Sequence, residues 1–170
     1  MGKSDTKDLL RFLKAFPSDM QERALWLRDF VWGLYPTANE LIYDNYNALA
    51  FGWSVTDRVG HLFCTIAVGR TSGNIHFGFY WGALLTDPKK LLIGKGNQYR
   101  YILVKNIDAF PKAYMQKMMK EAYALSMAKV KDKSQLVGGK TIVKSVSAAK
   151  RVLSKKKAVA KPKTKSKSMK

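Results

Sequence analysis

The sequence predicts an α+β protein, a two-layer sandwich in which helices from both ends of the chain pack on a mainly antiparallel sheet of about four to five strands. Three observations support this fold class. Apolar residues recur at helical spacing near both ends of residues 1–128, and they alternate with small or polar residues in between. All 20 Phe, Trp and Tyr residues lie before residue 129, so the aromatic material of a core is confined to that part.

Two helices are expected at the start of the chain. The first is short and ends before Pro17, which disfavours helical geometry in the residue before it. The second begins near Ser18 and runs to about Leu34, where Gly33 and Pro36 mark its end. The apolar stripes of the two helices are Leu9, Leu10, Phe12, Leu13 and Phe16, and then Ala24, Leu27, Val31 and Leu34.

The pattern changes after Pro36 from a period of about 3.6 to a period of 2, which is typical of strands. Strands are expected at residues 48–54, 61–69, 74–82 and 100–105. The turn Arg70-Thr71-Ser72-Gly73 joins the second and third of these as a hairpin.

Two further helices are expected. A short one follows Asp87-Pro88, which read as its cap and first residue, and ends at Gly94. The last opens at Asp108, and its core stripe is Met115, Met118, Ala122 and Leu125.

Charge divides the chain into two parts. Residues 1–128 hold 16 Lys/Arg against 11 Asp/Glu, whereas residues 129–170 hold 15 Lys/Arg and a single acid, Asp132. We therefore predict a folded domain at 1–128 and a basic, largely disordered tail at 129–170. Weak helical spacing within the tail predicts a short amphipathic helix near 143–153.

Composition also excludes several classes of protein. One cysteine, Cys64, rules out an internal disulfide and any multi-cysteine metal site. No apolar run approaches the roughly 20 residues that span a bilayer, and acids interrupt the first 30 residues, unlike a signal peptide. The expected location is therefore the cytoplasm, with association to the nucleoid if the tail binds DNA. No order of Ser, Cys, His and Asp with a nucleophile turn is present, so an enzyme is disfavoured.

Residues 78–101 read GFYWGALLTDPKKLLIGKGNQYRY, after ELIYDNYNALAFG at 40–52 and HLFCTIAV at 61–68. The segment 78–101 resembles the pattern G-F-x-x-G-x-x-L-x-D-P-x-x-L-L-x-G-x-G-x-x-x-R-H of the YdhG-like family, a domain of unknown function numbered 1801, except that Tyr101 stands where many members have His. The resemblance covers most of residues 5–125 and none of the tail. It implies a frataxin-shaped sandwich, and some relatives are described as frataxin-like iron chaperones.

A face of small residues on the expected strands is the first candidate site. Ser54 and Thr65 lie among its alanines and glycines, and His76 and Tyr80 edge it. A shallow sheet surface with a few polar groups suits a small ligand. Close packing of a helix against the small side chains is the favoured alternative.

A second candidate is the loop between Gly94 and Arg100. Its glycines allow backbone N–H groups to converge on an anion, and the nearby cations are Lys89, Lys90, Lys95 and Arg100. It lacks the spacing of a nucleotide-binding P-loop, so a simple turn is the favoured alternative.

The two histidines, His61 and His76, are expected far apart along the hairpin, so no metal site and no cofactor are predicted. An iron-handling role needs clustered carboxylates, and the first helix offers only Asp5 and Asp8 among basic residues.

The tail carries the strongest functional signal. Its density of cations favours sequence-nonspecific nucleic-acid binding through phosphate contacts, in a protein that is otherwise non-enzymatic. The alternatives are a solvated tail without a partner, attached to a small-ligand or iron-handling domain, and an anionic membrane surface, for which the tail has no Trp or Phe to insert. The expected nucleic-acid contacts are Lys144, Lys150, Arg151, Lys155, Lys156, Lys157, Lys161, Lys163, Lys165, Lys167 and Lys170.

Overall fold

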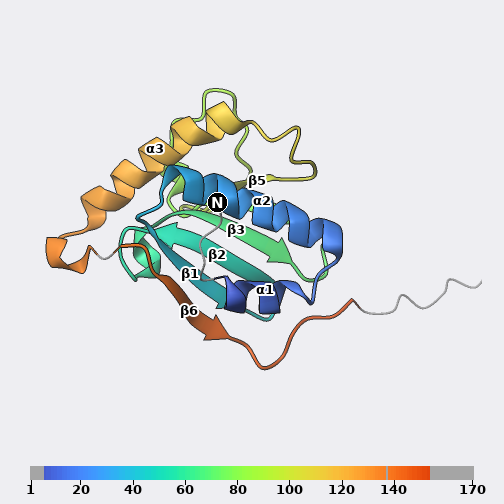
Figure 1. Ribbon diagram of the computed structural model, residues 1–170. Helices are drawn as coiled ribbons and strands as arrows, with labels where there is room; N and C mark the ends of the chain where they lie inside the picture. Colours follow the sequence, from blue (N-terminus) through green and yellow to red (C-terminus); the bar gives the residue numbers. More distant parts are fainter. Residues whose placement is uncertain (1–5, 137, 154–170) are drawn as a thin grey trace, which may run out of the picture.

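The computed structural model describes residues 6–136 and 138–153. One mixed sheet has the strand order β5-β4-β3-β2-β1-β6, in which only the β1–β6 pair is parallel (Figure 1). The elements are α1 (Lys7–Leu13), α2 (Ser18–Leu34), β1 (Asn39–Asp44), β2 (Ala48–Ser54), β3 (Leu62–Gly69), β4 (Ile75–Phe79), β5 (Arg100–Leu103), α3 (Lys112–Lys129) and β6 (Thr141–Val146).

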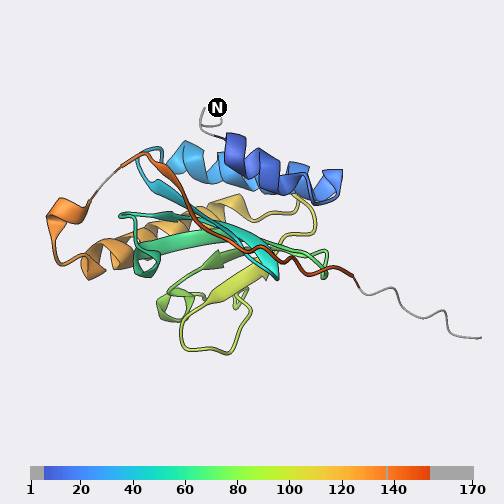
Figure 2. The same cartoon turned by 90° about the horizontal axis from the view of Figure 1, so that it is seen from below.

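The α+β fold class is confirmed, with six strands in place of the four to five expected. Figure 2 shows α1 and α2 on one side of the sheet and the segment between β4 and β5 on the other. We call the side covered by the helices the helix face, and the other side, which carries Ala50, Gly52, Thr65, Ala67 and His76, the open face. Among the described residues, no helix is long and apolar enough to span a membrane.

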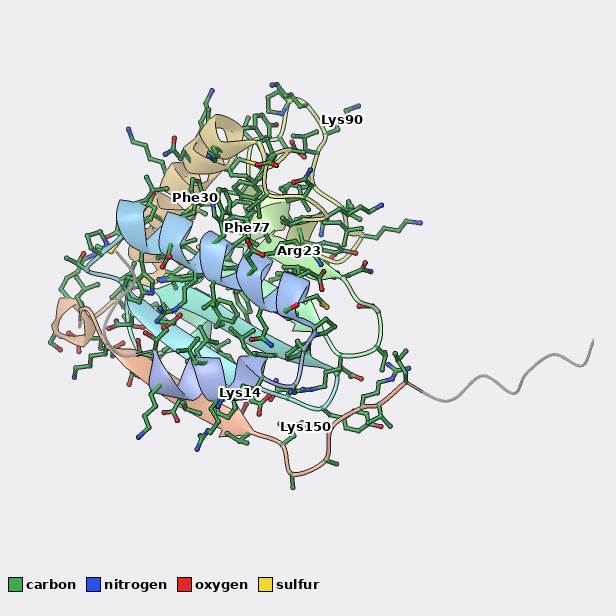
Figure 3. The ribbon with its side chains drawn as sticks, turned by 45° about the vertical axis from the view of Figure 1, so that its right-hand side comes forward. Lys14, Arg23, Phe30, Phe77, Lys90 and Lys150 are labelled. Atoms are coloured by element: carbon green, nitrogen blue, oxygen red, sulfur yellow. The ribbon has the colours of Figure 1, made fainter. Side chains whose placement is uncertain are left out.

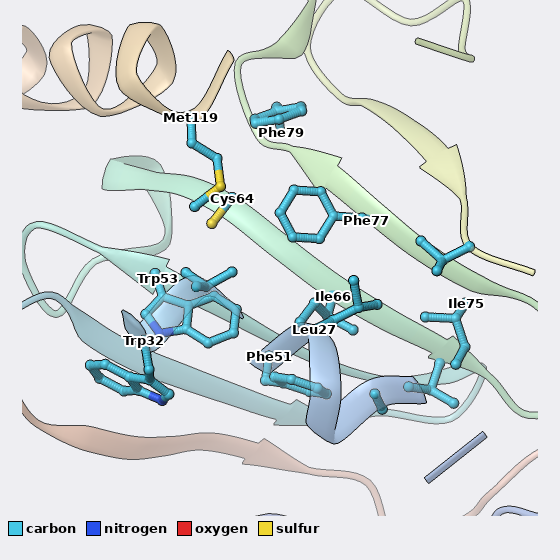
Figure 4. Packing of buried hydrophobic residues seen from close by; sticks show 14 of the residues in the cluster. Leu27, Trp32, Phe51, Trp53, Cys64, Ile66, Ile75, Phe77, Phe79 and Met119 are labelled. Atoms are coloured by element: carbon cyan, nitrogen blue, oxygen red, sulfur yellow. The ribbon is translucent and has the colours of Figure 1, made fainter. Parts of the chain in front are cut away.

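The hydrophobic core lies on the helix face. Its sheet layer is built from large side chains that are almost completely buried, and the helices close over them (Figure 4). Phe77 packs edge-on against Phe30 of α2 and Phe110, with ring centroids 6.4 and 5.3 Å apart. Burying a side chain of this size contributes about 1.5–3 kcal/mol. The strand residues of this layer include Phe51, Trp53, Cys64, Ile66, Ile75, Phe77 and Phe79.

A buried ion pair ties α2 to β1. Arg28 is 1% exposed, and its guanidinium donates two hydrogen bonds, of 2.7 and 2.8 Å, to the Glu40 carboxylate. Thr141 of β6 donates a third hydrogen bond to Glu40, at 3.0 Å. A buried charge is tolerated only when it is paired and hydrogen-bonded, and this carboxylate satisfies both conditions.

The structure corrects the predicted domain boundary at residue 128 and the predicted helix near 143–153. Residues 141–146 form β6, which pairs in parallel with β1 from Glu40↔Thr141 to Asp44↔Val146. The run Thr141-Ile142-Val143 is β-branched, which suits a strand, and the free edge of β1 supplies the hydrogen-bonding partner. The sequence alone does not reveal that edge, and the spacing of apolar residues near 143–153 fits a helix equally well.

The chain stays attached to the domain after β6. The Ser147 amide donates to the Asp44 carbonyl and the Arg151 amide to the Tyr46 carbonyl, both at 2.9 Å. The Lys150 ammonium lies 2.9 Å from the Asp44 carboxylate, whose other oxygen pairs with Arg70. The folded unit therefore reaches at least Arg151, and the rest of the predicted tail, 154–170, lies outside the described residues.

Two expected helices differ in the structure. The short one after Asp87 does not form, because the Asp87 carboxylate accepts the Leu91 and Leu92 amides and the Tyr114 hydroxyl, closing a loop instead. Burial raises the pKa of Asp87, but these three hydrogen bonds outweigh it and hold the pKa below its usual value. The last helix begins at Lys112, directly after Pro111, rather than at Asp108.

Candidate ligand-binding groove

The floor of the candidate site is the small-residue face, and the strand register brings its members together. Ala50 pairs with Ala67, which pairs with His76, and the next row contains Gly52, Thr65 and Gly78. Residues directly opposite one another in a sheet project on the same face. These rows therefore share the open face, where none of the helices in the described residues packs on them, contrary to the favoured alternative of helix packing.

Aromatic side chains from three elements form the walls. Tyr43 comes from β1, Tyr80 follows β4, and Tyr99 precedes β5. They enclose a groove of about 340 Å³ together with Asn45, Val59 and Leu62. We call this site the sheet groove. Its volume lies in the range of small-ligand sites.

The expected groove residues have two different outcomes. Thr65, His76 and Tyr80 all line the sheet groove. Ser54 does not, because it is buried and its hydroxyl donates to the Arg58 carbonyl at 3.1 Å. Its role is local, holding the turn after β2 that carries Val59 to the end of the groove.

Tyr99 lies directly over Gly78. A Cβ atom at Gly78 would stand 2.2 Å from the Tyr99 hydroxyl oxygen, so only glycine fits under this ring. Three rings then stack along the β4–β5 pair: His76 lies 4.0 Å from Tyr101 at an interplanar angle of 3°, and Tyr101 lies 5.7 Å from Tyr99 at 21°. Two rings of this stack, His76 and Tyr99, also line the groove.

The titratable groups of the groove are held in their uncharged forms. Burial, and secondarily the neighbouring Tyr80, raises the pKa of Tyr43 above its usual 10.0. Burial likewise raises the pKa of Tyr99, and it lowers the pKa of His76 below 6.5. The groove is therefore neutral at physiological pH, and it suits an uncharged planar group better than an ion.

One polar atom in the groove has no partner. The Tyr43 hydroxyl is buried and makes no hydrogen bond, whereas Thr65 donates to the Tyr99 hydroxyl at 3.4 Å. A buried hydroxyl without a hydrogen bond costs free energy, and since solvent does not reach this atom, the cost belongs to the packing of the groove wall.

The predicted anion loop has a different geometry. The Arg100 guanidinium donates to the carbonyls of Gly96 and Tyr99, so the loop turns carbonyl oxygens rather than amides toward its cation. Lys89 lies over the Tyr114 ring at 5.2 Å, and Lys90 is exposed with φ 52°. Lys95 is exposed at the loop tip. The favoured alternative, a structural turn, describes this loop better than an anion cradle does.

The tail cations that the structure describes are engaged with the domain. Lys144 donates to the Asp57 carbonyl at 3.0 Å, Lys150 pairs with Asp44, and Arg151 donates to the Asn47 side chain at 3.3 Å. Figure 3 shows Lys90 near the top of the molecule and Lys150 near the bottom, so these two cations lie far apart. Eight of the expected contacts lie outside the described residues: Lys155, Lys156, Lys157, Lys161, Lys163, Lys165, Lys167 and Lys170.

No metal centre emerges from the described part of the chain, which holds no group of three or more His, Cys, Asp or Glu side chains placed to bind one ion. His61 is engaged at 2.8 Å with Thr56, while His76 stacks on Tyr101.

Sequence reasoning missed Tyr43 and Tyr99. Tyr43 belongs to β1, which was not predicted because its burial pattern is nearly continuous instead of alternating. Tyr99 stands in a loop, where no periodicity exists to place it. Comparisons with family models, with curated proteins and with solved structures found no match to this chain.

Proposed function

We propose that this protein is a non-enzymatic nucleic-acid-binding protein that contacts phosphates without reading sequence. The observation that carries the proposal is its charge of +19. Within the described residues, 22 Lys/Arg stand against 11 Asp/Glu, and residues 154–170 add eight lysines and no acid. Such an excess attracts polyanions, and each neutralised phosphate releases a counterion.

The structure changes which part of the chain this proposal assigns to phosphate contacts. Lys150 and Arg151 are held by the β1–β2 connection, so the lysines of 154–170 replace the whole of 129–170 as the proposed basic arm. The folded domain carries its own excess of 11 positive charges, and it contributes to binding in this proposal. A cytoplasmic, nucleoid-associated location belongs to the same proposal.

A YdhG-like origin of the domain also remains our proposal. The pattern residues support it only in an architectural sense: Asp87 closes its loop, Gly78 lies beneath Tyr99, and a Cβ at Gly82 would stand 2.5 Å from the Arg100 Cβ. The rival iron-handling function has no specific observation in its favour among the described residues.

The test compares the full chain with a variant in which the eight lysines of 154–170 are replaced by Gln. Fluorescence anisotropy with a labelled DNA duplex measures the affinity of each at 50 and 200 mM salt. Engagement of six to ten phosphates predicts a loss of about a thousandfold or more over this range for the full chain, and a much shallower salt dependence for the variant.

Absence of binding by the full chain at 50 mM salt, both to the duplex and to a single strand of the same length, contradicts the proposed function. Equal affinity and equal salt dependence of the two proteins would instead assign binding to the folded domain and remove the basic arm from the proposal.

A further inference from the structure

The sheet groove is a cavity that the fold keeps open. Its floor consists of Ala50, Gly52 and Ala67, which are too small to fill the space between the aromatic walls. A sheet face that lacks large side chains but is bordered by Tyr43, Tyr80 and Tyr99 leaves about 340 Å³ accessible from solvent. Water in so apolar a groove is readily displaced by a planar apolar surface.

The shape and chemistry of the walls favour an aromatic guest. His76 and Tyr99 line the groove, Tyr101 stacks on both of these rings, and burial lowers the pKa of His76, which favours its neutral form. Neutral aromatic rings stack well on nucleobases, whatever the base, because every base has a π-face.

Cations stand at one end of the same groove. Tyr43 and Val59 separate it from a second, more open hollow that is lined by Arg58, His61 and Lys144. Arg58 and Lys144 are exposed, and Asp57 is the one carboxylate among the residues that line this hollow. The arrangement places an excess of positive charge beside a neutral aromatic slot, which complements a base and its adjoining phosphate.

We propose that the sheet groove binds one unpaired nucleobase of a single-stranded nucleic acid, with the neighbouring phosphate on Arg58 and Lys144. This inference rests on the proposed function and adds a preference to it. A duplex keeps its bases stacked and paired, so it reaches only the cations, whereas a single strand reaches the cations and the groove.

The experiment uses the full chain and a labelled single-stranded oligothymidine that carries one central 2-aminopurine, whose fluorescence reports stacking. A duplex of equal length is the comparison, at the same salt concentration. We expect the single strand to bind about tenfold more tightly than the duplex, with a change in 2-aminopurine emission on binding.

Filling the groove separates its role from that of the charges. Ala67→Leu places a large side chain on the floor, and we expect it to lower single-strand affinity about tenfold, abolish the emission change and leave duplex affinity within about twofold. Ala83→Leu makes the same change at an exposed site outside the groove and is the matched control. Thermal unfolding verifies that both variants fold.

A second pair keeps the test independent of one substitution. Tyr80→Ala removes a wall and is expected to act as Ala67→Leu does, whereas Tyr46→Ala removes a tyrosine that is 49% exposed and lies outside the groove. Adenosine monophosphate serves as a competitor. If adenosine monophosphate reverses the emission change with an affinity equal to that of the oligonucleotide, the proposal of a single-stranded ligand is overturned and the groove is assigned to free nucleotides.

The possible failures are distinguishable. If the full chain binds neither single strand nor duplex, the proposed function and this inference both fall. If it binds both with equal affinity, or if the two groove variants behave as their controls do, the groove proposal alone is overturned.

Discussion

The two faces of the sheet are made by the same strands and have opposite properties. On the helix face, Phe51 pairs with Ile66 and Ile66 with Phe77, and all three are completely buried. One residue further along each strand, the open face carries Gly52, Ala67 and Gly78. The period of 2 therefore sorts large side chains to one side and small ones to the other.

This difference separates stability from binding. The helix face contributes the buried apolar area on which folding depends, and its close packing leaves no room for a guest. The open face contributes less to folding and keeps a groove. Substitutions on the helix face should therefore change mainly the stability of the fold, and substitutions on the open face mainly ligand binding.

The largest expected difference concerns thiol reactivity. Cys64 points to the helix face, is fully buried, and has a pKa raised well above 9.0 by that burial. A thiol introduced one residue later, by Thr65→Cys in a Cys64→Ala background, lies on the open face. We expect the native Cys64 to react with a disulfide reagent about a thousandfold or more slowly than the introduced thiol, because its reaction waits for unfolding. Comparable rates would show that the helix face opens readily.

A truncation on each face sharpens the contrast in stability. Phe77→Ala should lower the free energy of unfolding by about 3–5 kcal/mol, because it removes a fully buried ring that contacts Phe30 and Phe110. Leu103→Ala, next to His76 on the open face, should cost only about 1 kcal/mol, because this side chain is half-buried. Urea denaturation measures both, and similar losses would remove the distinction between the faces.

Gly52 is the position where the open face is predicted to be as intolerant as the core. A Cβ there would stand 2.7 Å from the Thr65 methyl and 2.8 Å from the Cys64 carbonyl oxygen. Gly52→Ala should therefore cost about 1–3 kcal/mol. Gly60→Ala is the control, since nothing lies within 4 Å of its added methyl, and it should stay within about 0.5 kcal/mol. A neutral Gly52→Ala would mean that β2 and β3 adjust without cost.

The smallest expected effect is a pH dependence that originates on the open face. Burial lowers the pKa of His76 in the folded protein below 6.5, while the unfolded chain keeps the ordinary value. Below about pH 6.5 the unfolded state therefore binds more protons, and the free energy of unfolding falls as the pH decreases further through the folded-state pKa. Tyr101 stacks on the His76 ring, and Tyr80 lines the same groove.

His76→Gln should remove the contribution of His76 to the pH dependence of the free energy of unfolding. The loss of stability between pH 7 and 5 should therefore be smaller in the variant than in the natural protein. His61 is present in both proteins, so the comparison isolates His76. Identical pH profiles, measured by thermal unfolding, would show that the ring is fully hydrated in the folded state.

The alternation on β2, β3 and β4 was visible in the sequence, and so was the small-residue face that became the groove floor. The first two helices and the strands expected at 48–54, 61–69 and 100–105 form close to their predicted bounds, whereas the strand expected at 74–82 ends at Phe79. These elements were predictable because each has one buried face and one more exposed face, and this difference produces a regular period of apolar residues in the sequence. Thr65, His76 and Tyr80 were found for the same reason.

β1 and β6 could not be found in this way. β1 is buried almost throughout and carries Glu40, a residue that argues against burial until Arg28 is placed beside it. β6 follows a segment without aromatic residues, and its identity as a strand depends on the edge of β1. Pairing between distant segments leaves no local period to read.

The sequence by itself determined the fold class, the hairpin of β3 and β4, the polarity of the strands and the excess of positive charge, because these properties follow from local periodicity and composition. Only the tertiary structure decided that Lys144, Lys150 and Arg151 belong to the domain, that Arg100 donates to carbonyls, and that no helix within residues 6–136 and 138–153 covers the small-residue face. Each of these outcomes depends on which partner lies opposite a side chain, and that partner comes from a distant part of the chain.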